Sequence, residues 1–143
     1  MTTPRTTTVT GQDIGAAERA TRALLDRLLA ATGTDFTGWV LIDRLHAAGG
    51  ALPGAALLRT VAGGLRITEA TVVAALTGLT RDGLVESTSD VTLTEAGRDR
   101  YATIQAGIDA LAERLYGGLP TEDLVTARRI LVTVTERATA ELG

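Results

Sequence analysis

The side chains that most often carry out chemistry are scarce in this sequence. It holds one histidine, His46, and no cysteine, so disulfides and thiolate sites are excluded within the chain, and a transition-metal site with several converging ligands is not expected. No GxSxG nucleophile turn, no GKS/T phosphate loop and no HExxH zinc motif occurs. The sequence therefore predicts a protein that is not an enzyme and that has no metal or other cofactor.

Arginine is the remaining side chain with strong recognition chemistry. The chain has no lysine, so every basic residue is an arginine, whose guanidinium group can bind a phosphate or the edge of a guanine. The net charge of −3 gives no overall footprint for nucleic acid, although a local basic patch is compatible with it.

Apolar residues at helical spacing, together with capping residues and glycines, predict the elements that must position these arginines. We expect a first helix over residues 13–31 and a second between a cap at Thr34 or Asp35 and the pair Gly49-Gly50. A third helix is expected over 54–62, closed by Gly63-Gly64, and a fourth from an N-cap at Thr68 to about Asp82. A fifth should run from Thr94 to about Tyr116, and a last one should begin near Thr121.

Between the fourth and fifth helices the pattern changes. The segments Leu84–Glu86 and Val91–Leu93 are short and β-prone, and the turn-forming segment Ser87–Asp90 separates them. This predicts a tight hairpin. Residues 51–53 are expected to be a short extended piece that leads into the third helix.

The 143 residues suit one domain. Residues 1–12 are rich in threonine and are expected to be a disordered tail, which leaves 13–143 as the single folded domain. No apolar stretch approaches the ~20 residues of a membrane span, and the N-terminus lacks the apolar core of a secretory signal. A cytoplasmic protein with no membrane partner is therefore expected.

Several motifs in the right order give the chain a family resemblance. The segment Leu79–Glu86, which contains GLVE, is followed closely by Val91–Arg98, which contains LTEAGR; Asp35–Leu41 and Gly118–Leu124 add two further matches. On these residues the chain resembles the MarR family of bacterial regulators from about Asp13 to the C-terminus. The resemblance implies a mainly α fold with a small β-hairpin wing: a winged helix-turn-helix head over about 35–97, flanked by dimerisation helices over about 13–31 and 98–143.

The resemblance also implies that the fourth helix enters the major groove of double-stranded DNA while the wing reaches a neighbouring phosphate or the minor groove. With Val72, Leu76 and Leu79 facing inward, the outward residues include Thr71, Ala74, Gly78 and Arg81. The expected DNA-binding residues are Arg59, Arg66, Thr68, Thr71, Ala74, Arg81, Ser87 and Ser89. For Arg59 and Arg66 the alternative is ordinary surface charge or an ion pair with Glu69.

The head departs from the family in its charge. It carries four arginines against seven carboxylates, a net charge of −3, and its wing segment Ser87–Asp90 has no basic residue. Because phosphate neutralisation supplies most non-specific affinity, weak and salt-sensitive DNA binding is expected. An alternative hypothesis is a winged-helix scaffold that has lost DNA binding and binds a small molecule or a protein partner.

Relatives of this kind often bind small aromatic anions between the second helix and the dimerisation helices. The resemblance therefore implies a pocket for a small aromatic or anionic ligand, lined by Phe36, Trp39, His46 and Tyr101. The alternative is that Trp39 is a core residue and His46 a partly exposed residue at a helix end.

The apolar stripes of the first and last helices predict a homodimer. Two long terminal helices around a small head cannot easily bury both stripes within one chain, whereas a two-fold axis buries them and sets two recognition helices about one DNA turn (~34 Å) apart on a pseudo-palindromic site. The expected interface residues are Ile14, Leu24, Leu28, Ile130, Leu131 and Val134. The leading functional hypothesis is thus a dimeric transcriptional regulator, a repressor that responds to a small ligand.

Overall fold

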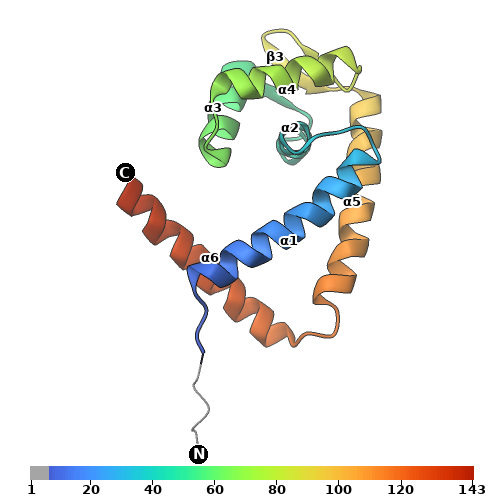
Figure 1. Ribbon diagram of the computed structural model, residues 1–143. Coiled ribbons are helices and arrows are strands. Elements are labelled where there is room, and N and C mark those ends of the chain that lie inside the picture. Colours follow the sequence, from blue (N-terminus) through green and yellow to red (C-terminus); the bar gives the residue numbers. More distant parts are fainter. Residues whose placement is uncertain (1–6) are drawn as a thin grey trace, which may run out of the picture. The chain divides into compact units, whose positions relative to one another are not determined.

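A computed structural model describes residues 7–143, which form two compact units, one ending at Ile108 and the other comprising Asp109–Gly143 (Figure 1). The first six residues of the expected tail lie outside the described residues. Within 7–143 no helix is both long and apolar enough to cross a membrane.

The first two helices begin at strong caps. Helix α1 spans Gly11–Ala30 and starts two residues before the expected position, because Thr10 and Asp13 form a reciprocal capping box. Helix α2 spans Phe36–Ala47, and of the two caps considered it is Asp35 that accepts the Gly38 amide at 2.7 Å.

Helix α3 spans Gly54–Leu65, so the prediction that Gly63-Gly64 closes it is wrong. Both glycines are helical, and the chain turns two residues after Gly64, at Arg66, whose backbone is left-handed (φ 56°). Leu65 and Ile67 pack against the core, which holds the helix together past the glycines. Helix α4 then spans Glu69–Arg81 with Thr68 as its N-cap, as predicted.

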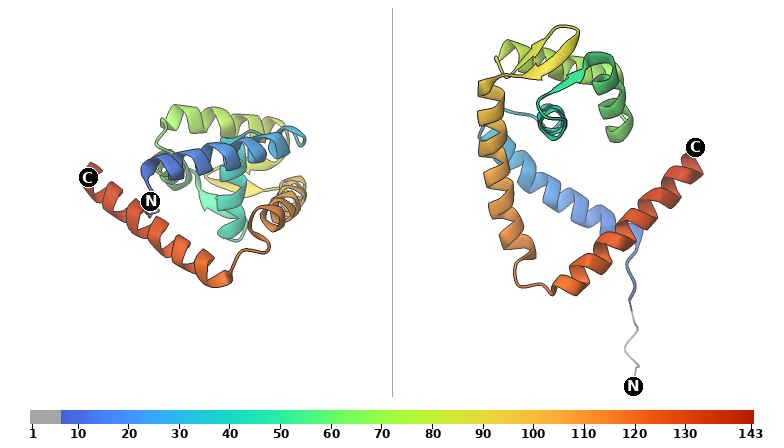
Figure 2. Two further views of the ribbon diagram at one scale, coloured as in Figure 1. Left: turned by 60° about the horizontal axis from the view of Figure 1, so that its bottom comes forward. Right: turned by 180° about the vertical axis from the view of Figure 1, so that it is seen from behind.

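The wing is confirmed, but the sheet has one strand more than expected. Strands β2 (Val85–Ser87) and β3 (Asp90–Leu93) form the hairpin, and β1 (Ala51–Pro53) pairs antiparallel with the other side of β3. The extended piece before α3 is therefore an edge strand that ties the start of α3 to the wing. Figure 2 shows the small sheet from two further directions.

Aliphatic side chains from α1 to α5 form the core of the first unit. Leu41, Ile42 and Leu45 of α2 lie at its centre with no exposed surface, and Trp39 is 7% exposed. Helix α5 spans Glu95–Tyr116 and contributes Ile104, also fully buried. Leu84, Val85, Val91 and Leu93 fasten the wing to this core.

The second unit contains the end of α5 and the whole of α6 (Thr121–Leu142). No residue of α6 is buried in this chain. Its aliphatic residues are instead widely exposed, a point that bears on assembly below.

Candidate nucleic-acid interface

Helix α4 is held by one side and leaves the other open. Val72, Leu76 and Leu79 are 0–8% exposed and pack on the core, as their spacing predicts. The β2–β3 hairpin lies beside α4 at the same end of the first unit (Figure 1). This pairing of an exposed helix with a wing is the arrangement that enters a DNA groove in winged-helix proteins.

The outward row of α4 differs in part from the expected one. Since residues four, seven and eleven positions apart share a helix face, the row opposite the core comprises Ala70, Ala74, Thr77 and Arg81, all of them exposed. Thr71 and Gly78 lie on one flank of that row. Ala70 and Thr77 were not among the predicted outward residues, because the predicted outward face was centred nearer to Thr71 and Gly78.

The threonine hydroxyls along α4 are already engaged within the helix. Thr77 Oγ1 donates to the Val73 carbonyl at 2.9 Å, and Thr80 Oγ1 donates to the Leu76 carbonyl at 2.9 Å. Thr68 and Thr71 share a hydroxyl–hydroxyl bond of 2.8 Å, and Thr68 Oγ1 also accepts the Thr71 amide at 3.2 Å. Thr77 and Thr80 therefore present their methyl groups and lone pairs more readily than an O–H donor, whereas one hydroxyl of the Thr68–Thr71 pair still has a hydrogen to donate.

Two arginines of the head lie at opposite ends of α4, so the arginines do not gather at one point. Arg66 precedes the helix and Arg81 ends it, so their backbones stand about 20 Å apart along a rise of 1.5 Å per residue. Arg59 is exposed on α3. Arg81 is 76% exposed, and its Nε lies 3.6 Å from Asp82 Oδ1, a weak surface pair that leaves the guanidinium accessible. The guanidinium of Arg98, the first residue after the head, is engaged within the chain, because its Nη1 donates to the Leu93 carbonyl at 3.1 Å.

The wing tip is exposed and uncharged at both serines. Ser87 and Ser89 are open to solvent, and the turn between them is closed by the Thr88 amide, which donates to the Asp90 carbonyl at 2.9 Å. The only charge in this turn is the carboxylate of Asp90. Phosphate contacts from the wing would thus rest on hydroxyl and amide groups.

The base of the wing is fixed by Thr94. Its hydroxyl donates to the Gly83 carbonyl at 2.6 Å and accepts the Gly97 amide at 3.1 Å, while its own amide donates to the Leu84 carbonyl at 3.1 Å. Gly83 has the left-handed backbone that the predicted sharp exit from α4 requires (φ 76°). The wing and α5 therefore share one hydrogen-bonded joint.

A shallow groove of about 530 Å³ runs between α3, α4 and the wing. Residues of α3, α4 and the wing line it: Leu58, Val73, Leu76, Thr77, Thr80, Arg81 and Ser87. Val73 is 44% exposed here, so its side chain contributes apolar surface to the groove. The groove joins the outward face of α4 to the wing in one continuous surface.

Three of the four residues expected to line a ligand pocket form an aromatic column between α2 and α5. The Tyr101 ring stacks on His46 with centroids 3.7 Å apart and on Trp39 with centroids 5.5 Å apart. Trp39 is buried, whereas His46 is exposed at the end of α2. Because the three rings stack on one another, a ligand at this column could contact only the ring faces and edges that the neighbouring side chains leave uncovered.

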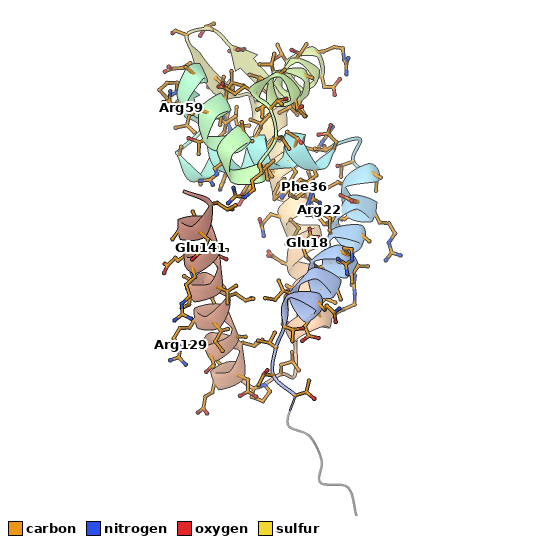
Figure 3. All side chains as sticks on the ribbon, turned by 60° about the vertical axis from the view of Figure 1, so that its left-hand side comes forward. Glu18, Arg22, Phe36, Arg59, Arg129 and Glu141 are labelled. Carbon is orange, nitrogen blue, oxygen red and sulfur yellow. The ribbon has the colours of Figure 1, made fainter. Side chains whose placement is uncertain are left out.

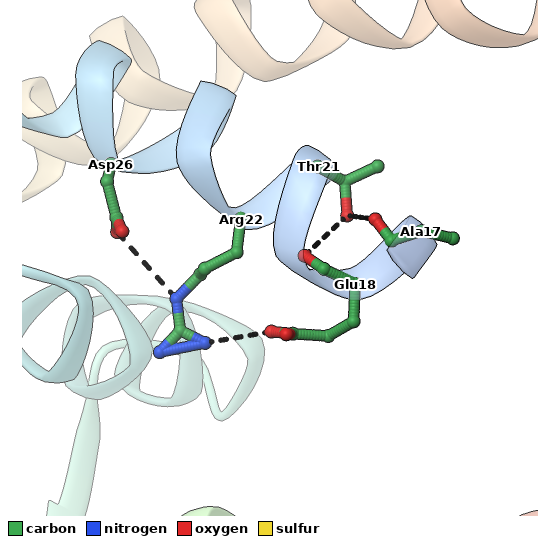
Figure 4. Close-up of polar contacts among 5 residues, drawn as sticks. All are labelled: Ala17, Glu18, Thr21, Arg22 and Asp26. Carbon is green, nitrogen blue, oxygen red and sulfur yellow. Dashed lines mark hydrogen bonds and ion pairs between the residues drawn. The ribbon is translucent and has the colours of Figure 1, made fainter. Parts of the chain in front are cut away.

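The fourth residue, Phe36, lies against Arg22; the resemblance implied an arginine to hold an anion here, but the sequence did not identify which one. The Arg22 guanidinium sits 3.2 Å from the Phe36 ring centroid (Figure 3). Two carboxylates of α1 flank this guanidinium: Arg22 Nη1 lies 3.3 Å from Glu18 Oε1, and Arg22 Nε lies 3.7 Å from Asp26 Oδ1 (Figure 4). The i,i+4 spacing of these charges was visible in the sequence, but their placement over Phe36 depends on how α1 meets α2.

The residues expected at a dimer interface differ in exposure. On α6, Ile130, Leu131 and Val134 are 39%, 46% and 42% exposed. On α1, Ile14, Leu24 and Leu28 are half-buried within the chain. The Leu28 side chain crosses Gly107 of α5 so closely that a Cβ there would lie 2.5 Å from Leu28 Cδ1.

Within residues 7–143 no group of three or more histidine, cysteine or acidic side chains is arranged to hold a metal ion.

Solved structures share this fold, although no protein-family model and no curated protein sequence matches the chain. A MarR protein from Peptoclostridium difficile aligns with a TM-score of 0.75 at 14% identity over 96% of this chain and 97% of its own. CouR from Rhodococcus jostii RHA1, bound to p-coumaroyl-CoA, aligns with a TM-score of 0.70 at 20% identity over 85% of this chain and 91% of its own.

An organohalide-sensing transcriptional regulator aligns equally well in its ligand-free form and in its 2,4-dichlorophenol-bound form. Both give a TM-score of 0.73 at 15% identity over 88% of this chain and 77% of theirs. At identities this low, the structural alignments establish the fold alone. They confirm the fold predicted from the sequence, a MarR-like winged helix.

Proposed function

We propose that this protein is a dimeric, ligand-responsive transcriptional regulator that binds double-stranded DNA and acts as a repressor. The observation that carries the proposal is the open face of α4 beside an exposed wing, on a fold shared with transcriptional regulators.

Dimerisation is supported by the exposed aliphatic residues of α6. Ile130, Leu131 and Val134, which share one face of the helix, are each at least 39% exposed, although each side chain gains about 1.5–3 kcal/mol from full burial. A second copy is the partner that a two-fold operator requires, because it supplies the second recognition helix about one DNA turn (~34 Å) away.

DNA binding would rest on few ionic contacts. Arg66 and Arg81 bracket α4, and Arg59 adds a third accessible guanidinium on α3. The free amides at the start of α4, after the Thr68 cap, point away from the helix and suit a phosphate. Affinity should therefore be modest in magnitude, and its salt slope should be set by these few residues.

The left-handed backbone of Arg66 supports a role for that residue. A non-glycine residue in this conformation costs on the order of 1 kcal/mol, and glycine would avoid most of this cost. A strained arginine in the turn two residues before the N-cap of α4 fits a phosphate-binding position.

The decisive experiment is fluorescence anisotropy of the full chain with the DNA flanking its own gene, against a scrambled duplex, at low and moderate salt. Selective binding supports the proposal. Arg66→Ala and Arg81→Ala should each weaken binding and lower the salt slope by about 0.9 for each phosphate that the arginine had neutralised, whereas Arg27→Ala on α1, outside the head, should change neither.

The charge of the head favours one specific alternative. Four arginines against seven carboxylates suit a winged-helix scaffold that no longer binds DNA. If the full chain shows no selective binding even at low salt, this alternative replaces the proposal, and small molecules and protein partners become the ligands to test.

Ligand response is proposed for the aromatic column and the neighbouring Arg22. Two of the similar regulators are bound to p-coumaroyl-CoA and 2,4-dichlorophenol, which are aromatic compounds. Here the exposed His46 ring ends the column and Arg22 offers a cation over Phe36, so a small aromatic anion would find both a ring and a positive charge.

Trp39 makes this testable because it is the only tryptophan in the chain. Quenching of its fluorescence by benzoate or by 2,4-dichlorophenol, together with release of bound DNA, would support the ligand site. Tyr101→Ala should abolish the quenching, whereas Tyr116→Ala, at the far end of α5, should leave it unchanged.

A further inference from the structure

The outward surface of α4 offers DNA unusually little polar chemistry. Arg81 is the only basic residue of the helix, and Glu69 is its only acidic one. The other exposed positions all carry methyl groups, and two of their hydroxyls, those of Thr77 and Thr80, are bonded back to the helix backbone: Ala70, Thr71, Val73, Ala74, Thr77 and Thr80.

The hydroxyl of Thr77 strengthens this apolar character. Its hydrogen is used in the 2.9 Å bond to the Val73 carbonyl, so the side chain cannot donate to a base without breaking that bond. Threonine bound back to its own helix in this way leaves its γ-methyl as the group presented outward. Val73, one turn before Thr77 on the same side of the helix, is 44% exposed and lines the groove that continues toward the wing.

We propose that α4 reads its DNA site chiefly through the methyl groups of thymine in the major groove, with Ala74, Thr77 and Val73 as the reading residues. This inference rests on the proposed function. Thymine is the one base that displays a methyl group in the major groove, and alanine and the threonine methyl are the side chains that pack on it. Arg81 then supplies a single charged contact at the end of the helix.

Recognition of thymine methyl groups and recognition of guanine predict that different base substitutions will weaken DNA binding. A guanine-reading helix loses affinity when N7 and O6 are removed, because arginine binds both atoms. A methyl-reading helix loses affinity when thymine becomes deoxyuracil, which keeps every hydrogen-bonding group and lacks only the methyl. Removing one buried methyl costs about a fourfold loss of affinity, and about fifteenfold when both half-sites of a palindrome are changed.

The experiment begins with selection of binding sites by the full chain from a random duplex library. Each thymine of the selected site is then replaced symmetrically by deoxyuracil, and each guanine by 7-deazaguanine, with affinities measured by anisotropy. We expect thymines at two or more positions of each half-site to be sensitive to loss of the methyl, and at most one guanine to be sensitive to loss of N7.

Matched variants assign the contact to Thr77. Thr77→Ser removes the methyl and keeps the hydroxyl, so it should weaken binding to the thymine duplex and abolish the effect of deoxyuracil at one position. Thr77→Val keeps a methyl and removes the hydroxyl, so it should retain both affinity and deoxyuracil sensitivity. Trp39 fluorescence checks that each variant is folded.

The outcomes separate this inference from the function on which it rests. Selective DNA binding that is insensitive to deoxyuracil, or that is abolished in Thr77→Val and kept in Thr77→Ser, overturns methyl readout and leaves a DNA-binding regulator standing. Failure to select any site overturns both. Sensitivity to deoxyuracil that disappears in Thr77→Ser supports the assignment of the reading residue.

Discussion

Gly97 is the position where one added methyl group should disturb the largest part of the head. It is buried in the first turn of α5, and a Cβ there would collide with the Leu84 backbone carbonyl and lie 3.0 Å from Leu93 Cδ2. The Leu84 carbonyl belongs to the chain segment that enters the wing, and it accepts the Thr94 amide at 3.1 Å. Gly97→Ala must therefore push α5 away from the wing, since a backbone oxygen cannot rotate aside.

The size of the effect follows from three contributions. Overpacking against backbone costs up to about 3 kcal/mol. Loss or distortion of the Thr94–Leu84 hydrogen bond adds about 1 kcal/mol, and the better helix propensity of alanine returns about 1 kcal/mol. We expect Gly97→Ala to lower the free energy of unfolding by about 3 kcal/mol.

Urea unfolding followed by Trp39 fluorescence measures this, because that tryptophan is 7% exposed in the folded chain. Protein concentration is held equal, since dimerisation would shift the transition. The control is Gly64→Ala in α3, where a Cβ meets nothing within 4 Å. That change should stabilise by up to about 1 kcal/mol. A Gly97→Ala variant within about 0.5 kcal/mol of the parent, or one no less stable than Gly64→Ala, would refute the expected clash with the Leu84 carbonyl.

Three further predictions follow from the caps, the strained turn and α6. Arg66→Gly relieves the left-handed backbone and should keep or slightly raise stability in urea while weakening DNA binding; weaker binding only in step with lower stability would contradict this. Thr94→Ala removes the bonds to Gly83 and to the α5 amide and should cost about 1–2 kcal/mol in thermal unfolding, whereas Thr94→Ser should cost far less. Val134→Glu should give a monomer in sedimentation, whereas Val125→Glu, on the other flank of α6, should leave a dimer; a monomeric parent chain would disprove the interface.

The sequence by itself determined the order of the elements and most of their boundaries. Asp35 and Thr68 cap their helices as expected, and Gly83 takes the left-handed turn before the wing, because caps and turns depend on residues within a few positions of one another. The apolar spacing of α4 likewise identified the three residues that it buries, since helical periodicity is a local property.

Tertiary structure alone decided the features that depend on distant residues. The edge strand β1 exists because β3, about forty residues later in the chain, offers it hydrogen-bonding partners. Helix α3 continues through two glycines because the packing of Leu65 and Ile67 outweighs a propensity cost of about 1 kcal/mol per glycine. Whether the arginines converge was equally undetermined, because a charge pattern along a chain gives no distance across a fold. The structure places Arg66 and Arg81 at opposite ends of α4 and Arg59 on α3, so the outward face of α4 is apolar at its centre and basic only at its ends.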